Sequence, residues 1–336
     1  MSHIKFKLTL DSKRSEYPIG YRDNLFLIGS CFSENMGAKL NTHLFNVLEN
    51  SHGILFNPIS VCNAIEDCII QKKYTSSDLF YLNDVWNSWN HHSKLSGITE
   101  LDALNKINES IKQGHAYLKS ANHLVITLGS AWLYQLNDNA PSAKGQVVAN
   151  NHKAPAVWFD KYLMKSEILI ELLQNMVKQL KQFNPHIHII FTISPVRHLR
   201  EGLIENNRSK AVLIQAVHEV VSQFESMEYF PAYEYVMDDL RDYRFYAEDL
   251  VHPNYAASQY VWEKLVETYM DKDTQSIMKQ VAELQLAMQH KPFFQGSESH
   301  QAFLQNCIVK TERLLTTYPY LNLSSHLSHF NAQLVK

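Results

Sequence analysis

The sequence is poor in cysteine and carries no excess of positive charge, and both shortages restrict what it can do. The 336 residues include 4 cysteines, none in a Cys-x-x-Cys pair, so a structural zinc site and a disulfide scaffold are both unexpected. So few cysteines fit a reducing compartment. The formal net charge of −3 argues against a broad nucleic-acid-binding surface. The cysteines are Cys31, Cys62, Cys68 and Cys307.

Long hydrophobic runs are missing as well. The first ten residues contain no apolar segment of the secretory-signal kind, and no later run is long enough to cross a membrane. Internal repeats and low-complexity tracts are also absent. We therefore expect a cytoplasmic protein with one large domain and an appendage.

The sequence does contain an alternation of apolar strands and amphipathic helices. Buried strands are predicted at residues 25–29, 123–129 and 187–193, with short ones at 53–56 and 229–233. Helical stripes occupy 99–120, 164–181, 210–224, 255–269, 273–289 and 301–317, and another begins near Met36 and extends to Leu48. This order predicts an α/β fold with a mainly parallel sheet.

Three segments lie outside this alternation. Residues 75–97 are rich in aromatic side chains and are predicted to form a long loop or lid. Residues 132–134 and 146–149 suggest a hairpin. The helices after residue 270 are expected to form a C-terminal extension on or beside a first domain of residues 1–270.

Two candidate nucleophiles follow the first strand. Ser30 and Cys31 lie between a buried strand and a helix, where ligand crevices of open α/β sheets are found. Amides at the helix start lower a thiol pKa and can bind an oxyanion. The alternative is structural, with Cys31 a small buried residue and Ser30 a helix cap.

A carboxylate and an imidazole are spaced for cooperation late in the chain. Asp249 and His252 are three residues apart, so Asp249 can orient His252 as a base toward a nucleophile. The competing interpretation makes Asp249 the cap of a helix that starts near Pro253.

Acyl transfer also needs donors aimed at the developing oxyanion. For Asn57 the alternative to an oxyanion donor is an Asx cap ahead of Pro58. For Gly129 and Ser130 the alternative is a simple turn. The candidates are Gly29, Gly53, Asn57, Gly129 and Ser130.

Further polar residues follow the strand at 187–193. Arg197 or His198 can contact an anionic substrate group there, although ordinary surface charge is the simpler interpretation. The His pairs at 91–92 and 186/188 lack an acidic partner at useful spacing, so we expect no metal and no cofactor.

These segments together resemble the GSCFA family, a bacterial branch of the SGNH (GDSL-like) hydrolase-like proteins. The resemblance covers about residues 25–262. It is carried by Ile28-Gly29-Ser30-Cys31-Phe32, Phe56-Asn57-Pro58, Ile126-Thr127-Leu128-Gly129-Ser130-Ala131-Trp132, Thr192-Ile193-Ser194-Pro195-Val196-Arg197, Ser209-Lys210-Ala211, Tyr229-Phe230-Pro231-Ala232-Tyr233-Glu234 and Asp249-x-x-His252-Pro253.

The resemblance implies a three-layer α/β/α sandwich of SGNH-hydrolase-like, flavodoxin-like type. It puts Cys31 in the place of the nucleophile and matches Asp249 and His252 to the last SGNH motif. The oxyanion Asn of the third motif would fall on the segment after Gly129, where it is missing, so Asn57 would have to replace it.

The implied activity is hydrolysis or transfer of an ester or thioester acyl group, with a small-molecule or saccharide acyl substrate. Either Cys31 or Ser30 can be the nucleophile. A non-catalytic small-molecule or carbohydrate-binding protein on the same fold is the alternative, with a clamp around Trp86 and Trp89. A second alternative is a redox thiol protein that forms a sulfenic acid at Cys31.

Overall fold

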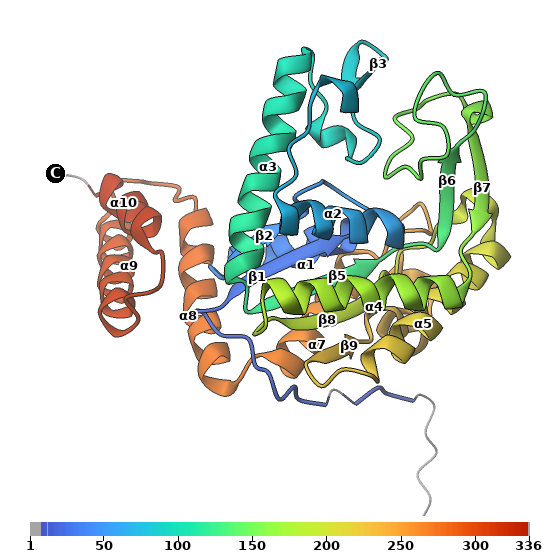
Figure 1. The fold of residues 1–336 in the computed structure, drawn as a ribbon. Helices are drawn as coiled ribbons and strands as arrows, with labels where there is room; N and C mark the ends of the chain where they lie inside the picture. The colour runs from blue at the N-terminus through green and yellow to red at the C-terminus, as the bar shows by residue number, and fades with distance from the viewer. Residues whose placement is uncertain (1–7, 12, 335–336) are drawn as a thin grey trace, which may run out of the picture.

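The computed structural model describes residues 8–11 and 13–334, and its centre is one parallel sheet with helices on both faces (Figure 1). All neighbouring strands of this sheet run parallel, in the order β2-β1-β5-β8-β9. Because every strand points the same way, all five carboxyl ends lie at one edge. The strands are β1 (Asn24–Gly29), β2 (Asn46–Glu49), β5 (His123–Leu128), β8 (His188–Ile193) and β9 (Met227–Phe230).

Side-chain alternation along the strands builds a hydrophobic core on each face of the sheet. Phe26 and Ile28 of β1 belong to the cluster formed with α2, α3, α4 and α5. Leu25 and Leu27 belong to the cluster formed with α1, α7, α8 and α9. The predicted three-layer α/β/α sandwich is therefore confirmed. The helices are α1 (Cys31–Thr42), α2 (Pro58–Ile70), α3 (Glu100–Ser120), α4 (Ser166–Phe183), α5 (Leu203–Val221), α6 (Ala232–Glu234), α7 (Tyr255–Tyr269), α8 (Lys272–Gln289), α9 (Glu298–Thr317) and α10 (Ser324–Ala332).

The second strand of the sheet is not the predicted one. The helix after β1 ends at Thr42, and Leu44 adopts a left-handed conformation with φ of 63°. The chain then forms β2 from residues that the sequence pattern placed at the end of that helix. Residues 53–56 are irregular, although the Leu55 amide donates to the carbonyl of Gly29.

Two small antiparallel hairpins lie outside the sheet. The predicted loop at 75–97 contains one of them, formed by β3 (Phe80–Leu82) and β4 (Val85–Asn87). The other joins β6 (Trp132–Leu136) to β7 (Phe159–Leu163). The segment predicted as the hairpin partner at 146–149 also lies against β6: Val148 donates to the carbonyl of Tyr134, Leu136 donates to that of Gln146, and Val147 forms an isolated bridge to Gln135.

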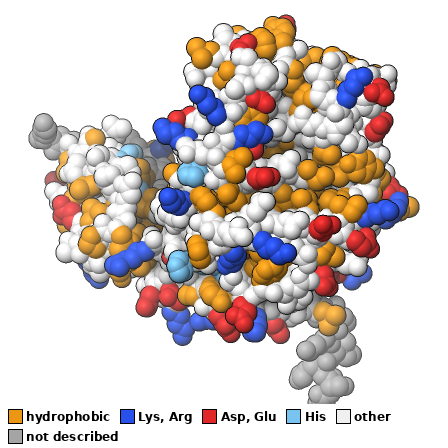
Figure 2. All heavy atoms as spheres, in the orientation of Figure 1, with side chains coloured by type: hydrophobic (Ala, Val, Ile, Leu, Met, Phe, Trp, Pro, Cys, Tyr) orange, Lys and Arg blue, Asp and Glu red, His pale blue; other side chains and the backbone are white. Residues whose placement is uncertain are grey.

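The C-terminal helices lie to one side of the sheet (Figure 1). Helices α8 and α9 share the second core cluster with the sheet, and Phe330 of α10 joins them. In the described part of the chain, no helix has the length and apolarity that a membrane crossing requires. The N-terminal stretch of residues 1–7, on which the absence of a signal sequence was argued, lies outside the described residues. Basic and acidic side chains are interspersed over the face in Figure 2.

Candidate active site

The carboxyl edge of the sheet collects residues from four separate segments. Cys31 follows β1, Ser130 follows β5 and Arg197 follows β8. The Arg197 amide donates to the carbonyl of Val251 at 3.2 Å, and its Nη1 donates to the carbonyl of Leu250 at 3.3 Å. These two bonds hold the loop that carries Asp249 and His252 against the segment after β8.

The turn after β1 separates the two candidate nucleophiles. Ser30 is fully buried, and its Oγ accepts from the Phe32 amide as the cap of α1. Cys31 is the first residue of α1 and is partly exposed. The turn needs a glycine because Gly29 has φ of +134° and a Cβ there would lie 2.0 Å from the Thr127 carbonyl oxygen.

The Cys31 thiol has opposing electrostatic influences. Burial raises its pKa, and the carboxylate of Glu34 acts in the same direction. The amides of Cys31 and Phe32 and the ammonium of Lys210 act against that rise. Because the net direction is upward, the thiol holds its proton at neutral pH and needs a base to become a nucleophile.

Lys210 of α5 is a residue of this edge to which no role was assigned from the sequence. It is 1% exposed, and its Nζ donates to the carbonyls of Gly129 at 2.7 Å and Ser194 at 2.6 Å. Burial lowers its pKa to about 7, while the neighbouring Cys31 raises it. The Ser209-Lys210-Ala211 motif was the available signal, but a sequence does not show which carbonyls a lysine will reach.

Asp249 and His252 form a direct pair. His252 Nδ1 lies 2.7 Å from Asp249 Oδ2, while Asp249 Oδ1 accepts from the amides of Val251 and His252. These bonds, the His252 amide first, lower the pKa of Asp249 to about 2. With Nδ1–H donated to the carboxylate, Nε2 of His252 is left with its lone pair. The cap of α7 is Asn254 rather than Asp249, so the helix-cap interpretation of Asp249 is wrong.

His198 follows β8 at the same edge. Burial, with smaller contributions from Lys210 and His252, lowers its pKa to about 3. Its ring packs edge-on against Phe56 with centroids 5.1 Å apart. In the described part of the chain its Nε2 is buried without a hydrogen-bond partner. The sequence offered His198 only as an alternative to Arg197.

Several predicted oxyanion donors already have partners. The amides of Gly129 and Ser130 both donate to the carbonyl of Phe56 at 2.9 Å. The Gly53 amide donates to the carbonyl of Asn50 at 2.7 Å. Ser130 Oγ accepts from the amide of Trp132 two residues on, at 3.1 Å. These groups hold the turns at the sheet edge together.

Gly29 and Asn57 are also engaged. The Gly29 amide donates to Asn50 Oδ1 at 2.9 Å. Asn57 caps α2 through Ser60 and donates from Nδ2 to the carbonyl of Val148 at 3.1 Å. The Asx-cap interpretation of Asn57 is therefore confirmed, and one hydrogen of its amide is left for another acceptor.

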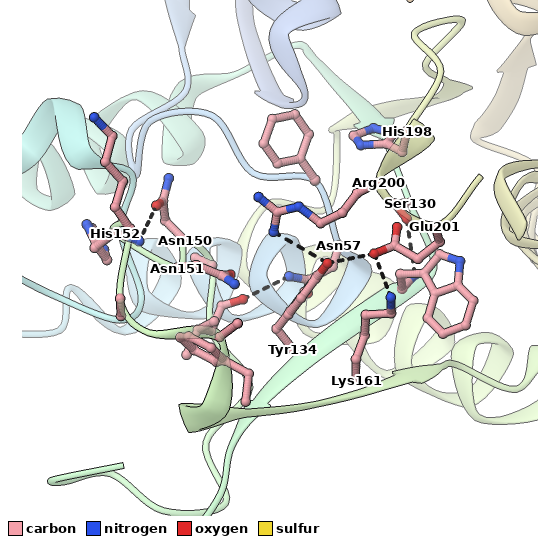
Figure 3. Close-up of a pocket in the computed structure, with 18 of the residues that line it drawn as sticks. Asn57, Ser130, Tyr134, Asn150, Asn151, His152, Lys161, His198, Arg200 and Glu201 are labelled. Atoms are coloured by element: carbon pink, nitrogen blue, oxygen red, sulfur yellow. Dashed lines mark hydrogen bonds and ion pairs between the residues drawn. The ribbon is translucent and has the colours of Figure 1, made fainter. Parts of the chain in front are cut away.

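A cavity of about 810 Å³ opens beside these residues (Figure 3). Asn57, Ser130, Arg197 and His198 line it, so it adjoins the predicted site. Its opposite wall comes from β6, β7 and the connection between them. In Figure 3, Arg200, Tyr134, Lys161 and Glu201 meet in its centre. The sequence pattern missed this wall because β6 pairs with a strand more than twenty residues away.

Of the two tryptophans expected to clamp a ligand, Trp89 is packed inside the protein, whereas Trp86 is half-buried beside the exposed ring of Tyr81. Trp89 is 4% exposed and stacks on Phe80 with ring centroids 3.8 Å apart. His91 is 1% exposed and stacks on His52. Among the residues that the structure describes, no group of three or more His, Cys, Asp and Glu is placed to hold a metal ion.

Buried neutral histidines predict that acid destabilises the fold. Burial lowers the pKa of His152 from its ordinary 6.5 to about 4, and the pKa of His91 is lowered in the same direction. As the pH falls, the imidazole of His152 is therefore protonated in the unfolded chain before it is protonated in the folded one. The free energy of unfolding keeps its full value above pH 6.5. As the pH falls from 6.5 to 4, the neutral buried His152 lowers the free energy of unfolding by up to about 3 kcal/mol.

Urea unfolding followed by fluorescence from pH 7 to pH 4 measures this loss. His152→Asn should flatten the slope, because asparagine tolerates the φ of 49° at this position. An equally steep loss of stability in His152→Asn would attribute the acid sensitivity to other groups.

Comparison with known proteins gives a family match and several distant structural likenesses. A model of the GSCFA family matches residues 24–265, and a model described as the GSCFA domain protein, C-terminal domain, matches residues 281–336. No curated protein matches the sequence significantly.

Two of the similar solved structures are esterases. A carbohydrate esterase family 3 structure from Talaromyces cellulolyticus is 8% identical with a TM-score of 0.37, over 76% of this chain and 98% of that one. An acetyl xylan esterase from the rumen bacterium Butyrivibrio proteoclasticus is 10% identical with a TM-score of 0.38, over 75% of this chain and 64% of that one. Likenesses this distant carry no inference about what this chain does.

Proposed function

The chain belongs to the GSCFA family, and from the chemistry at its sheet edge we propose that it cleaves or transfers the acyl group of an ester or thioester. In this proposal Cys31 is the nucleophile, His252 the base and Asp249 the residue that orients the base. The observation that carries the proposal is the 2.7 Å pair of His252 Nδ1 and Asp249 Oδ2, held by Arg197 at the edge where Cys31 lies.

The first half of the reaction forms a thioester on the protein. Nε2 of His252 takes the proton of the Cys31 thiol, and the sulfur attacks the acyl carbon. The bond from that carbon to the leaving oxygen or sulfur then breaks, and the imidazolium returns the proton to the leaving group.

The second half returns the enzyme to its starting state. Water, or an acceptor hydroxyl in the transferase variant, loses its proton to His252 and attacks the thioester carbon. The Cys31 sulfur leaves and regains a proton. The products are an acid or a new ester, together with the alcohol or thiol released first.

Oxyanion stabilisation in this proposal comes from the start of α1. The first amides of a helix have no acceptor within the helix, and the Cys31 amide, which already acts on the sulfur of Cys31, is the first donor. The Phe32 amide is bonded to Ser30 Oγ. The remaining hydrogen of the Asn57 side-chain amide is a second donor. The amides of Gly53, Gly129 and Ser130 are not needed, which suits their internal bonds.

A binding protein without turnover is the second candidate. The engaged amides of Gly129 and Ser130 favour it, since they occupy the place where the resemblance leaves the oxyanion asparagine missing. Such a protein binds its ligand in the cavity beside Asn57 and leaves the acyl bond intact.

The experiment is turnover of short-chain p-nitrophenyl esters and acyl thioesters by wild type and His252→Ala. We expect His252→Ala to lower kcat about a hundredfold, and added imidazole to restore part of the rate. Arg244→Gln is the matched control, because this exposed side chain pairs with Asp242 and packs over Phe245 near the same loop. Equal rates in His252→Ala and wild type would refute the proposed base.

Four free thiols suit a reducing environment, and a cytoplasmic location is part of this proposal.

A further inference from the structure

The cavity beside the candidate active site has a chemistry of its own. It has a volume of about 810 Å³, enough for several sugar rings or a comparable small molecule. It adjoins the loop that carries His252 through Arg197, which lines the cavity and donates to the carbonyls of Leu250 and Val251. A ligand held there would extend from the acyl bond into the space under β6 and β7.

One wall of the cavity is aromatic. Trp132 and Tyr134 come from β6 and Phe159 from β7, and the rings of Tyr134 and Phe159 meet edge to face with centroids 6.2 Å apart. Ring faces of this kind offer an apolar surface with polar neighbours, which suits the C–H faces of a sugar. Amides that can bond to hydroxyls line the same space and belong to Asn57, Asn150 and Asn151.

The cavity is also positively charged. Its only carboxylate among the described lining residues is Glu201, which is already paired with Lys161 at 2.7 Å and accepts from the Tyr134 hydroxyl at 2.8 Å. The cationic lining residues are Lys153, Lys161, Arg197 and Arg200. One carboxylate against four cations leaves the lining with an excess of positive charge.

Arg200 is the cation best placed for a ligand. Its Nη1 donates to the Tyr134 hydroxyl at 3.4 Å, and its guanidinium lies 5.6 Å from the centre of that ring. Figure 3 shows it pointing into the cavity between Tyr134 and Asn57. In the described chain it forms no ion pair with a carboxylate, and a planar guanidinium binds carboxylates and phosphates with two parallel hydrogen bonds.

We infer that this cavity binds a saccharide bearing an anionic group, with sugar rings on the Trp132 wall and the anion on Arg200. The inference rests on the proposed function, because the saccharide is then the alcohol part of the ester that Cys31 cleaves. Carboxylate and phosphate share the chemistry that Arg200 recognises, and the choice of probes separates them.

Isothermal titration calorimetry of the full chain tests the inference. The Cys31→Ala variant is used so that the probes bind without turnover. The anionic probes are trigalacturonate and glucose 6-phosphate. The neutral probe is galactotriose, and inorganic phosphate is the anion without a sugar. We expect at least one anionic sugar to bind about tenfold or more tightly than both galactotriose and inorganic phosphate.

Two variants separate the parts of the site. Arg200→Gln should weaken the anionic sugar at least about tenfold and leave galactotriose unchanged. Trp132→Ala should weaken every sugar probe. Arg313→Gln on α9 is the matched control, because this arginine is exposed and distant from the cavity.

Each contrary outcome has a distinct meaning. Galactotriose binding as tightly as the anionic sugars overturns the anionic part, and inorganic phosphate binding as tightly overturns the saccharide part. No binding of any probe overturns the inference. If wild type still hydrolyses simple esters in that case, the proposed function stands without it. If the sugars bind but wild type has no turnover on any ester, the proposed function fails and the binding site remains.

Discussion

Replacing Cys31 by alanine removes acyl turnover, with kcat lowered by about a thousandfold or more. The thiol is the group that forms the bond to the acyl carbon, so no neighbouring side chain can take over its step. Rates of p-nitrophenyl acetate and acyl thioester hydrolysis, with saturating substrate, measure the loss. Far-ultraviolet circular dichroism checks that the variant is folded, since a partly exposed Cys→Ala change at a helix start disturbs little.

Ser30→Ala is the matched comparison. Ser30 is fully buried, and its Oγ caps α1 by accepting from the Phe32 amide at 3.3 Å. Losing a cap costs about 0.5–2 kcal/mol of stability, and we expect kcat to remain within a fewfold of wild type. The reverse pattern, with activity lost in Ser30→Ala and kept in Cys31→Ala, would make the serine the nucleophile.

The sheet could be predicted from sequence because buried parallel strands are short apolar runs. Residues 25–29, 123–129 and 187–193 have no polar alternation that would suit a helix or an exposed strand. Helix α7 was also predicted with the bounds that the structure has, since Asn254 and the apolar stripe after it mark a start clearly.

Long-range pairing was the part that sequence could not reveal. Strand β2 depends on the left-handed backbone conformation of Leu44. Leucine rarely adopts this conformation, and no local sequence pattern predicts it here. Strand β6 bonds to the nearer segment at 146–149, as predicted, but it also pairs with β7, which lies further along the chain. The cavity wall follows from that pairing and was therefore missed with it.

In the candidate site, too, the residues paired by local spacing were predicted and those placed by tertiary packing were not. The sequence order identified Asp249 and His252 as partners because three residues of a turn bring them together without any help from the fold. Lys210 and His198 reach the site through the packing of α5 and of the segment after β8. Their role depends on burial, and a charged residue does not reveal its burial in one sequence.

Lys210→Met should produce the largest loss of stability at the site. The substitution removes the donor of two buried carbonyls, those of Gly129 and Ser194, and each unsatisfied carbonyl costs about 1–3 kcal/mol. Urea unfolding at pH 8 measures the total. At that pH Lys210 is mostly neutral, because burial has lowered its pKa to about 7, so the loss reports hydrogen bonds more than charge.

The same variant tests whether Lys210 acts on the thiol. Below pH 7 the ammonium of Lys210 favours the Cys31 thiolate, so its removal should slow Cys31 alkylation by iodoacetamide below pH 7 and change the rate little at pH 8, where Lys210 is mostly neutral. Mass spectrometry assigns the modified residue, and the buried Cys62, Cys68 and Cys307 should react slowly in the native state.

Lys181→Met separates this influence from the general effect of losing a lysine. Lys181 of α4 also donates to a backbone carbonyl, that of Ile187, but at the opposite edge of the sheet. Its loss should lower stability and leave the alkylation profile of Cys31 where it is in wild type. A folded Lys210→Met with an unchanged profile would mean that Lys210 only ties β5 to β8.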